Sequence, residues 1–181
     1  STIASSAGSM ETIETVVGRP KDPIARNMLK RDVLFGNEAL QNKMSCNLYR
    51  PMAAGVAQDD EANLAAAKAF VTHLIESVGP EEYDEVFGVI CSPSHVSFTD
   101  KSNLVATLRG QVNAIMVVTE PFATAYGIGE YNGTICVDIG AGTTDIARLY
   151  GIFPTDEDQL TIQEAGDWID MELMTLVQKK F

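Results

Sequence analysis

The segment from Val137 to Asp145 constrains the fold more than any other part of the sequence. Its residues are Val137-Asp138-Ile139-Gly140-Ala141-Gly142-Thr143-Thr144-Asp145. An apolar run leads a carboxylate into a glycine turn, and apolar residues resume after the turn, which is typical of two strands joined by a short loop. No lysine and no helix follow the glycines, so the loop is neither a P-loop nor a dinucleotide fingerprint. The segment predicts a strand–loop–strand unit.

The same loop carries the residue types that bind phosphate. Gly140 and Gly142 lack a Cβ and can adopt positive φ, so that backbone N–H groups can close on phosphate oxygens. Thr143 and Thr144 add hydroxyl donors, and Asp138 can hold a water of hydrated Mg²⁺. The alternative is a plain β-hairpin with a glycine-rich turn. The neighbouring carboxylates and hydroxyls favour the phosphate-binding interpretation.

Strands and helices alternate along the chain. Helical spacing of apolar residues or turn signals predict helices over 59–78, 101–112 (with Thr99 or Asp100 as N-cap), 121–126 and 166–180. Apolar runs predict strands over 86–91, 114–118, 134–139, 144–150 and 160–164, with weaker β signals at 13–17 and 33–35. This order indicates a layered α/β sheet.

Composition excludes several classes of function. The chain has 181 residues, with 13 Lys and Arg against 25 Asp and Glu, and its net charge of −12 opposes binding to nucleic acid or to an anionic membrane. No apolar run reaches the length of a membrane span. The N-terminus lacks the features of a signal peptide, so we expect a cytoplasmic protein without direct membrane insertion. Cys46, Cys91 and Cys136 show no metal-ligand spacing and are expected to be buried thiols.

Three motifs, in order, resemble those of the actin, Hsp70 and sugar-kinase superfamily. Asp138 to Asp145 resembles its second phosphate loop, Glu120 to Gly127 its connecting helix, and Ala165 to Asp170 the element after the loop. The resemblance implies an actin-like (ribonuclease H-like) α/β fold, with a mixed sheet flanked by helices. Residues 1–127 would form the first domain, without its first strand and first phosphate loop. Residues 128–181 would begin the second.

Within the superfamily, the chain is most similar to bacterial actins, first to the magnetosome actins and then to the MreB group. The stretches that carry this similarity are Val16 to Asp22, Asp138 to Asp145, and Glu157 to Thr161 ahead of Ala165. The resemblance implies an ATPase that uses ATP and Mg²⁺ and polymerises with itself into cytoplasmic, cytoskeletal filaments. Such filaments would position or align magnetosomes, with magnetosome-associated proteins as further partners.

The resemblance also implies roles for individual residues. Glu120 would position the water that attacks the γ-phosphate, and Asp138 would hold Mg²⁺ through water. The nucleotide would contact Gly140, Ala141, Gly142, Thr143, Thr144 and Gly166. Structural alternatives stay open for three acidic residues: Glu120 as a charge at a helix N-terminus, Asp145 as a turn-stabilising side chain, and Asp167 as the start of the last helix. His95 and His73 are expected to be structural.

Other functions share these motifs. The alternatives are an Hsp70-type chaperone or reactivating factor, an MreB-like cell-shape protein, a nucleotide-binding adaptor at the membrane, and a small-molecule kinase. The chain resembles a fragment that starts after the first phosphate loop and stops before the adenosine-binding residues. We therefore expect that the 181 residues alone neither hydrolyse ATP efficiently nor polymerise, and that ATPase activity belongs to the intact protein.

Overall fold

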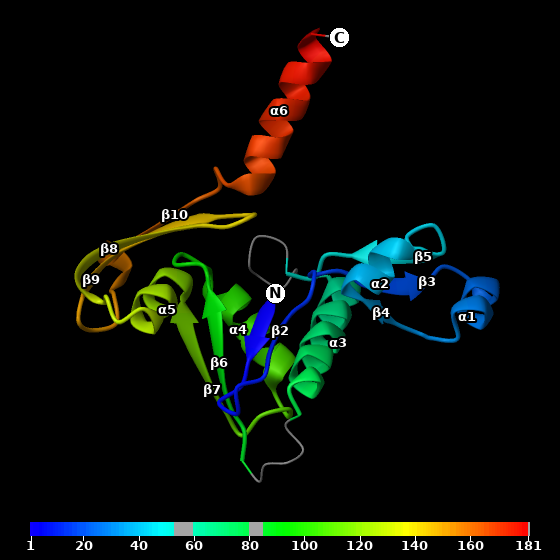
Figure 1. The fold of residues 1–181 in the computed structure, drawn as a ribbon, viewed down its shortest axis with the longest axis horizontal. Helices are drawn as coiled ribbons and strands as arrows, with labels where there is room; N and C mark the ends of the chain where they lie inside the picture. Colours follow the sequence, from blue (N-terminus) through cyan, green and yellow to red (C-terminus); the bar gives the residue numbers. More distant parts are fainter. Residues whose placement is uncertain (53–59, 80–84, 181) are drawn as a thin grey trace. The chain divides into compact units, whose positions relative to one another are not determined.

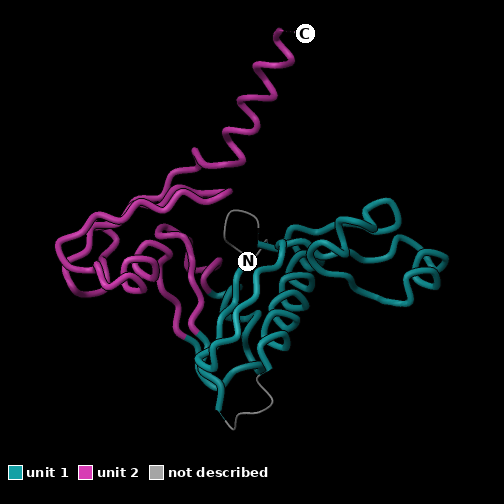
Figure 2. The backbone as a smooth tube through the Cα atoms, in the orientation of Figure 1, with its two compact units in different colours: residues 1–53, 57–88, 102–115 teal, residues 54–56, 89–101, 116–181 magenta. Residues whose placement is uncertain are grey.

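The computed structural model describes residues 1–52, 60–79 and 85–180. The chain divides into two compact units (Figure 2). Unit 1 comprises Ser1–Ala53, Ala57–Gly88 and Ser102–Ile115, and unit 2 comprises Ala54–Val56, Val89–Lys101 and Met116–Phe181. Chain segments that are distant in sequence therefore fold together within each unit.

Helices and strands alternate as expected (Figure 1). The strands are β1 (Thr2–Ala4), β2 (Met10–Thr12), β3 (Val17–Pro20), β4 (Leu34–Phe35), β5 (Cys46–Tyr49), β6 (Phe87–Ser92), β7 (Ala114–Thr119), β8 (Asn132–Ile139), β9 (Thr144–Tyr150) and β10 (Gln159–Ile162). The helices are α1 (Pro23–Leu29), α2 (Gly36–Gln41), α3 (Glu61–Ser77), α4 (Phe98–Leu108), α5 (Glu120–Gly127) and α6 (Gly166–Lys180), with a 3-10 turn, η3, at Asp156–Asp158.

The strands form small sheets. β1 pairs antiparallel with β2, β3 lies between β4 and β5, β6 neighbours β7, and β9 lies between β8 and β10. The strand expected at 13–17 is wrong, because the chain pairs from Val17 to Pro20 instead. A Cβ on Gly18 would lie 3.1 Å from the Cβ of Ala39, so glycine favours this close packing of β3 against α2.

Unit 1 is built around α3. Val17 packs against Phe70 in a buried apolar cluster that also contains Ala66 and Leu74. His73 stacks on Phe35 with ring centroids 4.2 Å apart, which agrees with its expected structural role. Asp60 caps the helix by accepting a hydrogen bond from Asn63 N at 2.9 Å. Asp59, the first residue of the predicted helix, lies outside the described residues.

Unit 2 is built around α5, which covers one face of the β8–β9–β10 sheet. Ala125 of the helix packs with Ala147 and Leu149 of β9, and Phe122 and Cys136 pack against this cluster. The helix begins at Glu120, with proline in its first turn, where the fixed φ and missing N–H of proline cost least. The core of unit 2 therefore sets the position of Glu120 against the sheet.

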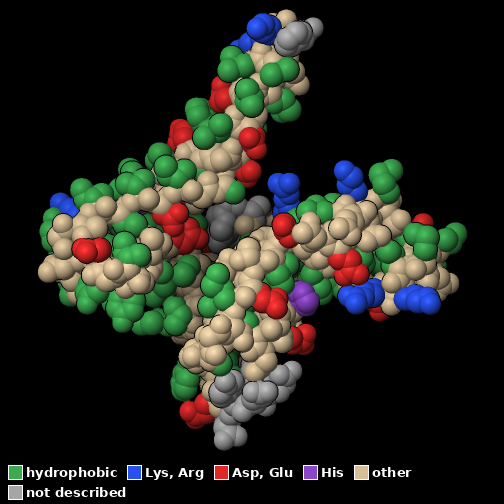
Figure 3. Space-filling model, viewed as in Figure 1, with side chains coloured by type: hydrophobic (Ala, Val, Ile, Leu, Met, Phe, Trp, Pro, Cys, Tyr) green, Lys and Arg blue, Asp and Glu red, His purple; other side chains and the backbone are tan. Residues whose placement is uncertain are grey.

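The last helix exposes apolar side chains along its length (Figure 3). Helical spacing places Ile169, Leu173, Leu176 and Val177 on one face of the helix, and all four are exposed. The helix itself is confirmed, with bounds of Gly166–Lys180. Among the described residues, no helix combines the length and apolarity needed to cross a bilayer.

Two local predictions are corrected by the structure. Helix α4 starts at Phe98, before the caps expected at Thr99 or Asp100. Its cap is Ser97, whose Oγ accepts from Asp100 N at 3.1 Å and donates to Asp100 Oδ2 at 2.7 Å. Of the cysteines expected to be buried, Cys91 is exposed and Cys136 is half-buried, because alternate residues of a strand point to opposite faces.

Candidate functional site

A row of polar side chains crosses the β8–β9–β10 sheet on the face that α5 covers. In the strand register, Asp138 of β8 lies opposite Asp145 of β9, and Asp145 lies opposite Thr161 of β10. Residues paired in this way point to the same face of a sheet. Asp145 is also two residues from Ala147 on its strand, so this face is the one that packs against α5. The fold therefore gathers two carboxylates and a hydroxyl beneath the helix.

Glu120 starts the helix that covers this row and is half-buried. Burial, and after it the negative charges of Asp145 and Asp138, together raise the pKa of its carboxyl group to about 7. A carboxyl group with a pKa near neutral can hold or release a proton at physiological pH, which suits a group that orients a reacting water. The structure thus brings Glu120 into electrostatic contact with the two carboxylates of the sheet.

The glycine loop between β8 and β9 is fastened to the start of α6. Gly140 N donates to Thr143 O at 2.9 Å, which closes the loop. The first two N–H groups of α6 then donate to the loop: Gly166 N to Gly140 O at 3.1 Å and Asp167 N to Ala141 O at 2.7 Å. The exposed Asp167 thus acts through its backbone at the start of the helix, in line with its structural interpretation. These bonds place Gly166 against the loop.

The loop keeps backbone donors available. Among the described residues, no acceptor is bonded to the N–H groups of Ala141, Gly142 or Thr143. Neither Gly140 nor Gly142, however, uses the positive φ that the sequence suggested. A Cβ on Gly140 would lie 3.3 Å from Thr143 O, so glycine is needed for close approach of the backbone. Successive unpaired N–H groups in a tight loop form a suitable cradle for phosphate oxygens.

Thr144 has a structural bond of its own. Its hydroxyl donates to Glu164 O at 2.8 Å, and its side chain is buried. This bond joins the start of β9 to the segment that follows β10. In this conformation the hydroxyl of Thr144 stabilises the local fold. The hydroxyl of Thr143 lies in the loop itself, on one of the residues whose N–H groups have no acceptor among the described residues.

Asp145 is buried and bonded to two other segments. Its Oδ1 accepts from Ser94 N at 2.6 Å and from Thr161 Oγ1 at 2.5 Å. Its Oδ2 is buried without a partner among the described residues. The side chain therefore does more than stabilise its own turn, because it ties the segment after β6 and strand β10 to β9.

The sequence alone did not indicate that Ser94 and Thr161 belong to this site. One signal was available for the carboxylates: Asp138 and Asp145 lie two residues before and two residues after the loop Gly140–Thr143, so a regular hairpin places them opposite each other. Nothing in the sequence placed Ser94 beside Asp145, which lies 51 residues away. His95 has the structural role expected, because its Nε2 lies 2.8 Å from Gln159 O.

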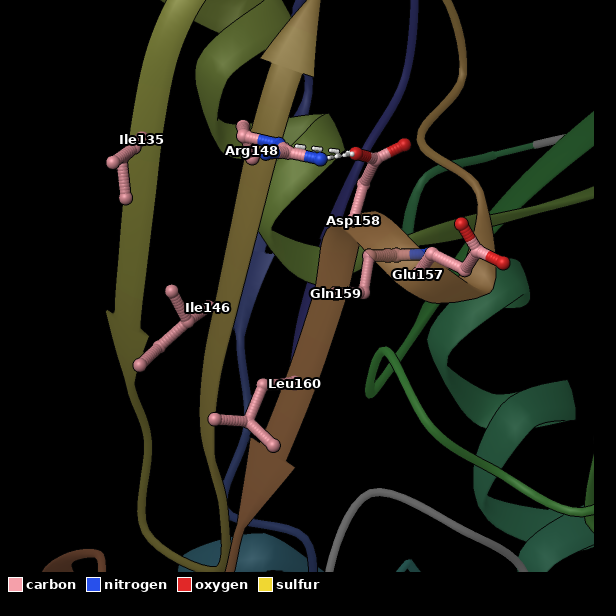
Figure 4. A pocket seen from close by; sticks show the side chains of 7 residues that line it. All are labelled: Ile135, Ile146, Arg148, Glu157, Asp158, Gln159 and Leu160. Atoms are coloured by element: carbon pink, nitrogen blue, oxygen red, sulfur yellow. Dashed lines mark hydrogen bonds and ion pairs between the residues drawn. The ribbon is translucent and has the colours of Figure 1, made fainter.

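A shallow pocket opens on the other face of the same sheet (Figure 4). Ile135, Ile146 and Leu160 line it, and Arg148 Nη2 donates to Asp158 Oδ1 at 2.7 Å on its rim. Ile135 and Asp138 are three residues apart on β8 and so point to opposite faces. The pocket is therefore separate from the candidate site.

Comparison with known proteins identifies the family. The family described as MreB/Mbl protein matches residues 26–181. The chain belongs to the MreB/Mbl family. It is 35% identical to the actin-like protein MamK of Magnetospirillum gryphiswaldense, over 98% of this chain and 50% of the relative, and 35% identical to MamK of Paramagnetospirillum magneticum, over 98% of this chain and 52% of the relative. The cell shape-determining protein Mbl of Bacillus subtilis is 30% identical over 73% of this chain and 40% of the relative.

Solved structures show that this MreB/Mbl chain has the expected actin-like fold. It matches a MamK double helical filament with a TM-score of 0.93 and 35% identity, covering 98% of this chain and 55% of that one. It matches a non-polymerising MamK mutant bound to AMPPNP with a TM-score of 0.78 and 34% identity, covering 99% of this chain and 55% of that one. The chain spans about half the length of the two MamK proteins that it matches.

Proposed function

We propose that this MreB/Mbl-family chain belongs to an ATP-binding and ATP-hydrolysing bacterial actin that polymerises into cytoplasmic filaments, which position or align magnetosomes. The observation that carries the proposal is the meeting of Glu120, Asp138 and the Gly140–Thr143 loop at one end of a single sheet. The similarity to MamK supports it, because MamK forms filaments and a MamK mutant binds AMPPNP. Residues 1–127 then form the first actin-like domain and residues 128–181 begin the second.

The residues present suit a nucleotide with magnesium. The N–H groups of Ala141, Gly142 and Thr143, which have no acceptor within the part of the chain that the structure describes, supply donors for phosphate oxygens. The half-buried carboxylate of Asp138, at the end of β8, suits the hydration shell of Mg²⁺. Magnesium, when bound, neutralises negative charge on the phosphates. Gly140, Thr144 and Gly166 hold the loop in this conformation by the hydrogen bonds described above.

Glu120 is proposed to orient the attacking water. Phosphoryl transfer depends on positioning and on electrostatic stabilisation more than on covalent chemistry. A half-buried carboxyl group with a pKa of about 7 can accept a hydrogen bond from water and take up a proton near neutral pH. Partial burial of the Glu120 carboxyl group and the two carboxylates of the sheet produce this property together.

Self-assembly is the proposed partner interaction. A filament requires a head-to-tail contact between copies, which leaves both ends open to further subunits. Magnetosome-associated proteins are proposed as additional partners, on the basis of the similarity to MamK alone. The net charge of −12 opposes a nucleic-acid partner.

The test is sedimentation with electron microscopy and phosphate release on the complete gene product, with and without MgATP. We expect filaments in MgATP, and for Glu120→Ala we expect phosphate release to fall by about 100-fold while filaments persist longer. Glu76→Ala is the matched control, because Glu76 is an exposed glutamate of α3 in unit 1.

Two outcomes would contradict the proposal. A wild-type protein that turns over ATP without forming any polymer would favour a chaperone or a kinase. Equal phosphate release in the Glu120→Ala and Glu76→Ala variants would remove Glu120 from the reaction while leaving the filament proposal standing.

A further inference from the structure

Asp145 is buried more completely than its neighbours in the candidate site. Only 1% of its surface is exposed, whereas Asp138 and Glu120 are half-buried. A buried carboxylate is costly unless hydrogen bonds compensate it. Here Oδ1 has two donors, while Oδ2 is buried and has no partner among the described residues. Such an unsatisfied buried atom requires an explanation beyond packing.

The carboxylate links three segments of unit 2. Asp145 lies on β9, Ser94 lies in the turn between β6 and α4, and Thr161 lies on β10. The hydroxyl of Thr161, which donates to Asp145, also accepts from His95 N at 2.9 Å. The Ser94–His95 turn is therefore held at two successive N–H groups, one directly and one through Thr161.

This link lies where the proposed chemistry takes place. Asp145 is opposite Asp138 in the sheet register and shares the face that α5 covers. A well-packed apolar side chain in the place of Asp145 would avoid the free-energy cost of burying a charge. Costly local arrangements that a fold retains are expected at functional sites.

We propose that Asp145 is a positioning residue for ATP hydrolysis: Oδ1 holds the Ser94–His95 turn and β10 in place around the site, and Oδ2 accepts a hydrogen bond from an ordered water. This inference rests on the proposed ATPase function. Buried water commonly satisfies polar atoms that have no protein partner, and it needs a polar site such as this one. Asp145 acts through Thr161, the turn and the water, without contacting the nucleotide.

The first test removes the Thr161 hydroxyl in the complete gene product. We expect Thr161→Val to lower kcat per nucleotide-binding site by about tenfold, with KM changed less than about twofold, because a hydrogen bond to a charged group is lost away from the nucleotide. Thr161→Ser restores the hydroxyl and should restore kcat. Thr134→Val, at a half-buried threonine of β8 in the same sheet, is the matched control and should leave kcat unchanged.

The second test separates the two oxygens of Asp145. Asp145→Asn can keep an oxygen acceptor for Ser94 N and Thr161 Oγ1, but it places an NH₂ donor where Oδ2 was. We expect kcat to fall by about tenfold while the Ser94 amide stays protected from hydrogen exchange. In Thr161→Val, protection should be lost at His95 and retained at Ser94. Exchange rates are a readout that does not depend on turnover.

The outcomes distinguish this inference from the function on which it rests. A wild-type protein that hydrolyses no ATP overturns both. A wild-type protein that hydrolyses ATP, with full kcat in Thr161→Val and Asp145→Asn, overturns only the positioning role of Asp145. Loss of kcat in Thr161→Val that Thr161→Ser fails to restore also overturns it, because the hydroxyl would then not be the cause.

Discussion

The β8–β9–β10 sheet departs from most antiparallel sheets in two ways: its exposed face carries several apolar side chains, and its buried face holds a carboxylate beside the apolar core. Such sheets usually bury an apolar face and expose a polar one. Here the face under α5 carries buried Leu149 together with the carboxylate of Asp145, whereas the open face exposes Ile135, Val137 and Ile139. In this sheet the face buried under a helix therefore encloses a carboxylate as well as an apolar core.

The largest expected effect comes from comparing a substitution on the covered face of the sheet with one on the open face. Leu149→Ala removes a side chain that is 0% exposed and should lower the free energy of unfolding by about 2–5 kcal/mol, since a cavity is left under α5. Ile135→Ala, at a residue that is 69% exposed on the open face, should change it by less than about 0.5 kcal/mol. Urea unfolding of the 181-residue chain measures both. Equal losses would show that the open face is buried in solution.

An intermediate effect concerns the ionisation of Glu120. Its pKa is raised from 4.5 to about 7, so the folded state holds this proton more tightly than the unfolded state does. The stabilisation is fully present below pH 4.5 and is lost as the pH rises through about 7. Glu120→Gln cannot ionise and should therefore be more stable than wild type at pH 8, by about 1–2 kcal/mol after allowance for partial exposure.

Thermal unfolding at pH 4 and pH 8 measures this difference. The wild-type and Glu120→Gln proteins should differ more at the higher pH. If the difference in stability between the two proteins is the same at pH 4 and at pH 8, the pKa of Glu120 is not raised by its surroundings.

The smallest expected effect lies on the open face. The guanidinium of Arg148 holds the pKa of Asp158 below its usual range by hydrogen bonding, with a further bond from Thr155. Because this pair is in contact with solvent, Arg148→Ala should change the midpoint of thermal unfolding by less than Leu149→Ala or Glu120→Gln does, and added salt should erase the difference. Thermal scans at low ionic strength and in about 1 M NaCl test this. A difference that survives high salt would mean that the pair is shielded.

Local sequence signals predicted most elements of unit 2 because those elements depend on short-range patterns. The apolar runs at 114–118, 134–139 and 144–150 became β7, β8 and β9, and the prolines and glycines around α5 set its bounds within a residue or so. Predictions failed where distant segments decide the outcome. β3 starts at Val17 because it pairs with β4 and β5, and Gly18 fits against Ala39 of α2.

In the candidate site, too, local sequence predicted some features and contacts between distant segments decided the others. The loop motif placed Asp138 and the glycines correctly at a strand–loop–strand junction, because the hairpin is local. The contact between His95 and Thr161 joins residues 66 positions apart, which no local pattern encodes. The free backbone donors of the loop also depend on α6, whose first N–H groups bind the carbonyls of Gly140 and Ala141.

By itself, the sequence determined that a carboxylate, a glycine loop and a second carboxylate follow one another across a hairpin, since strand alternation and turn chemistry act between neighbours. Only the tertiary structure decided how those groups behave. Packing between segments leaves Asp145 only 1% exposed and raises the pKa of Glu120 to about 7, because desolvation and like charge depend on distances between segments.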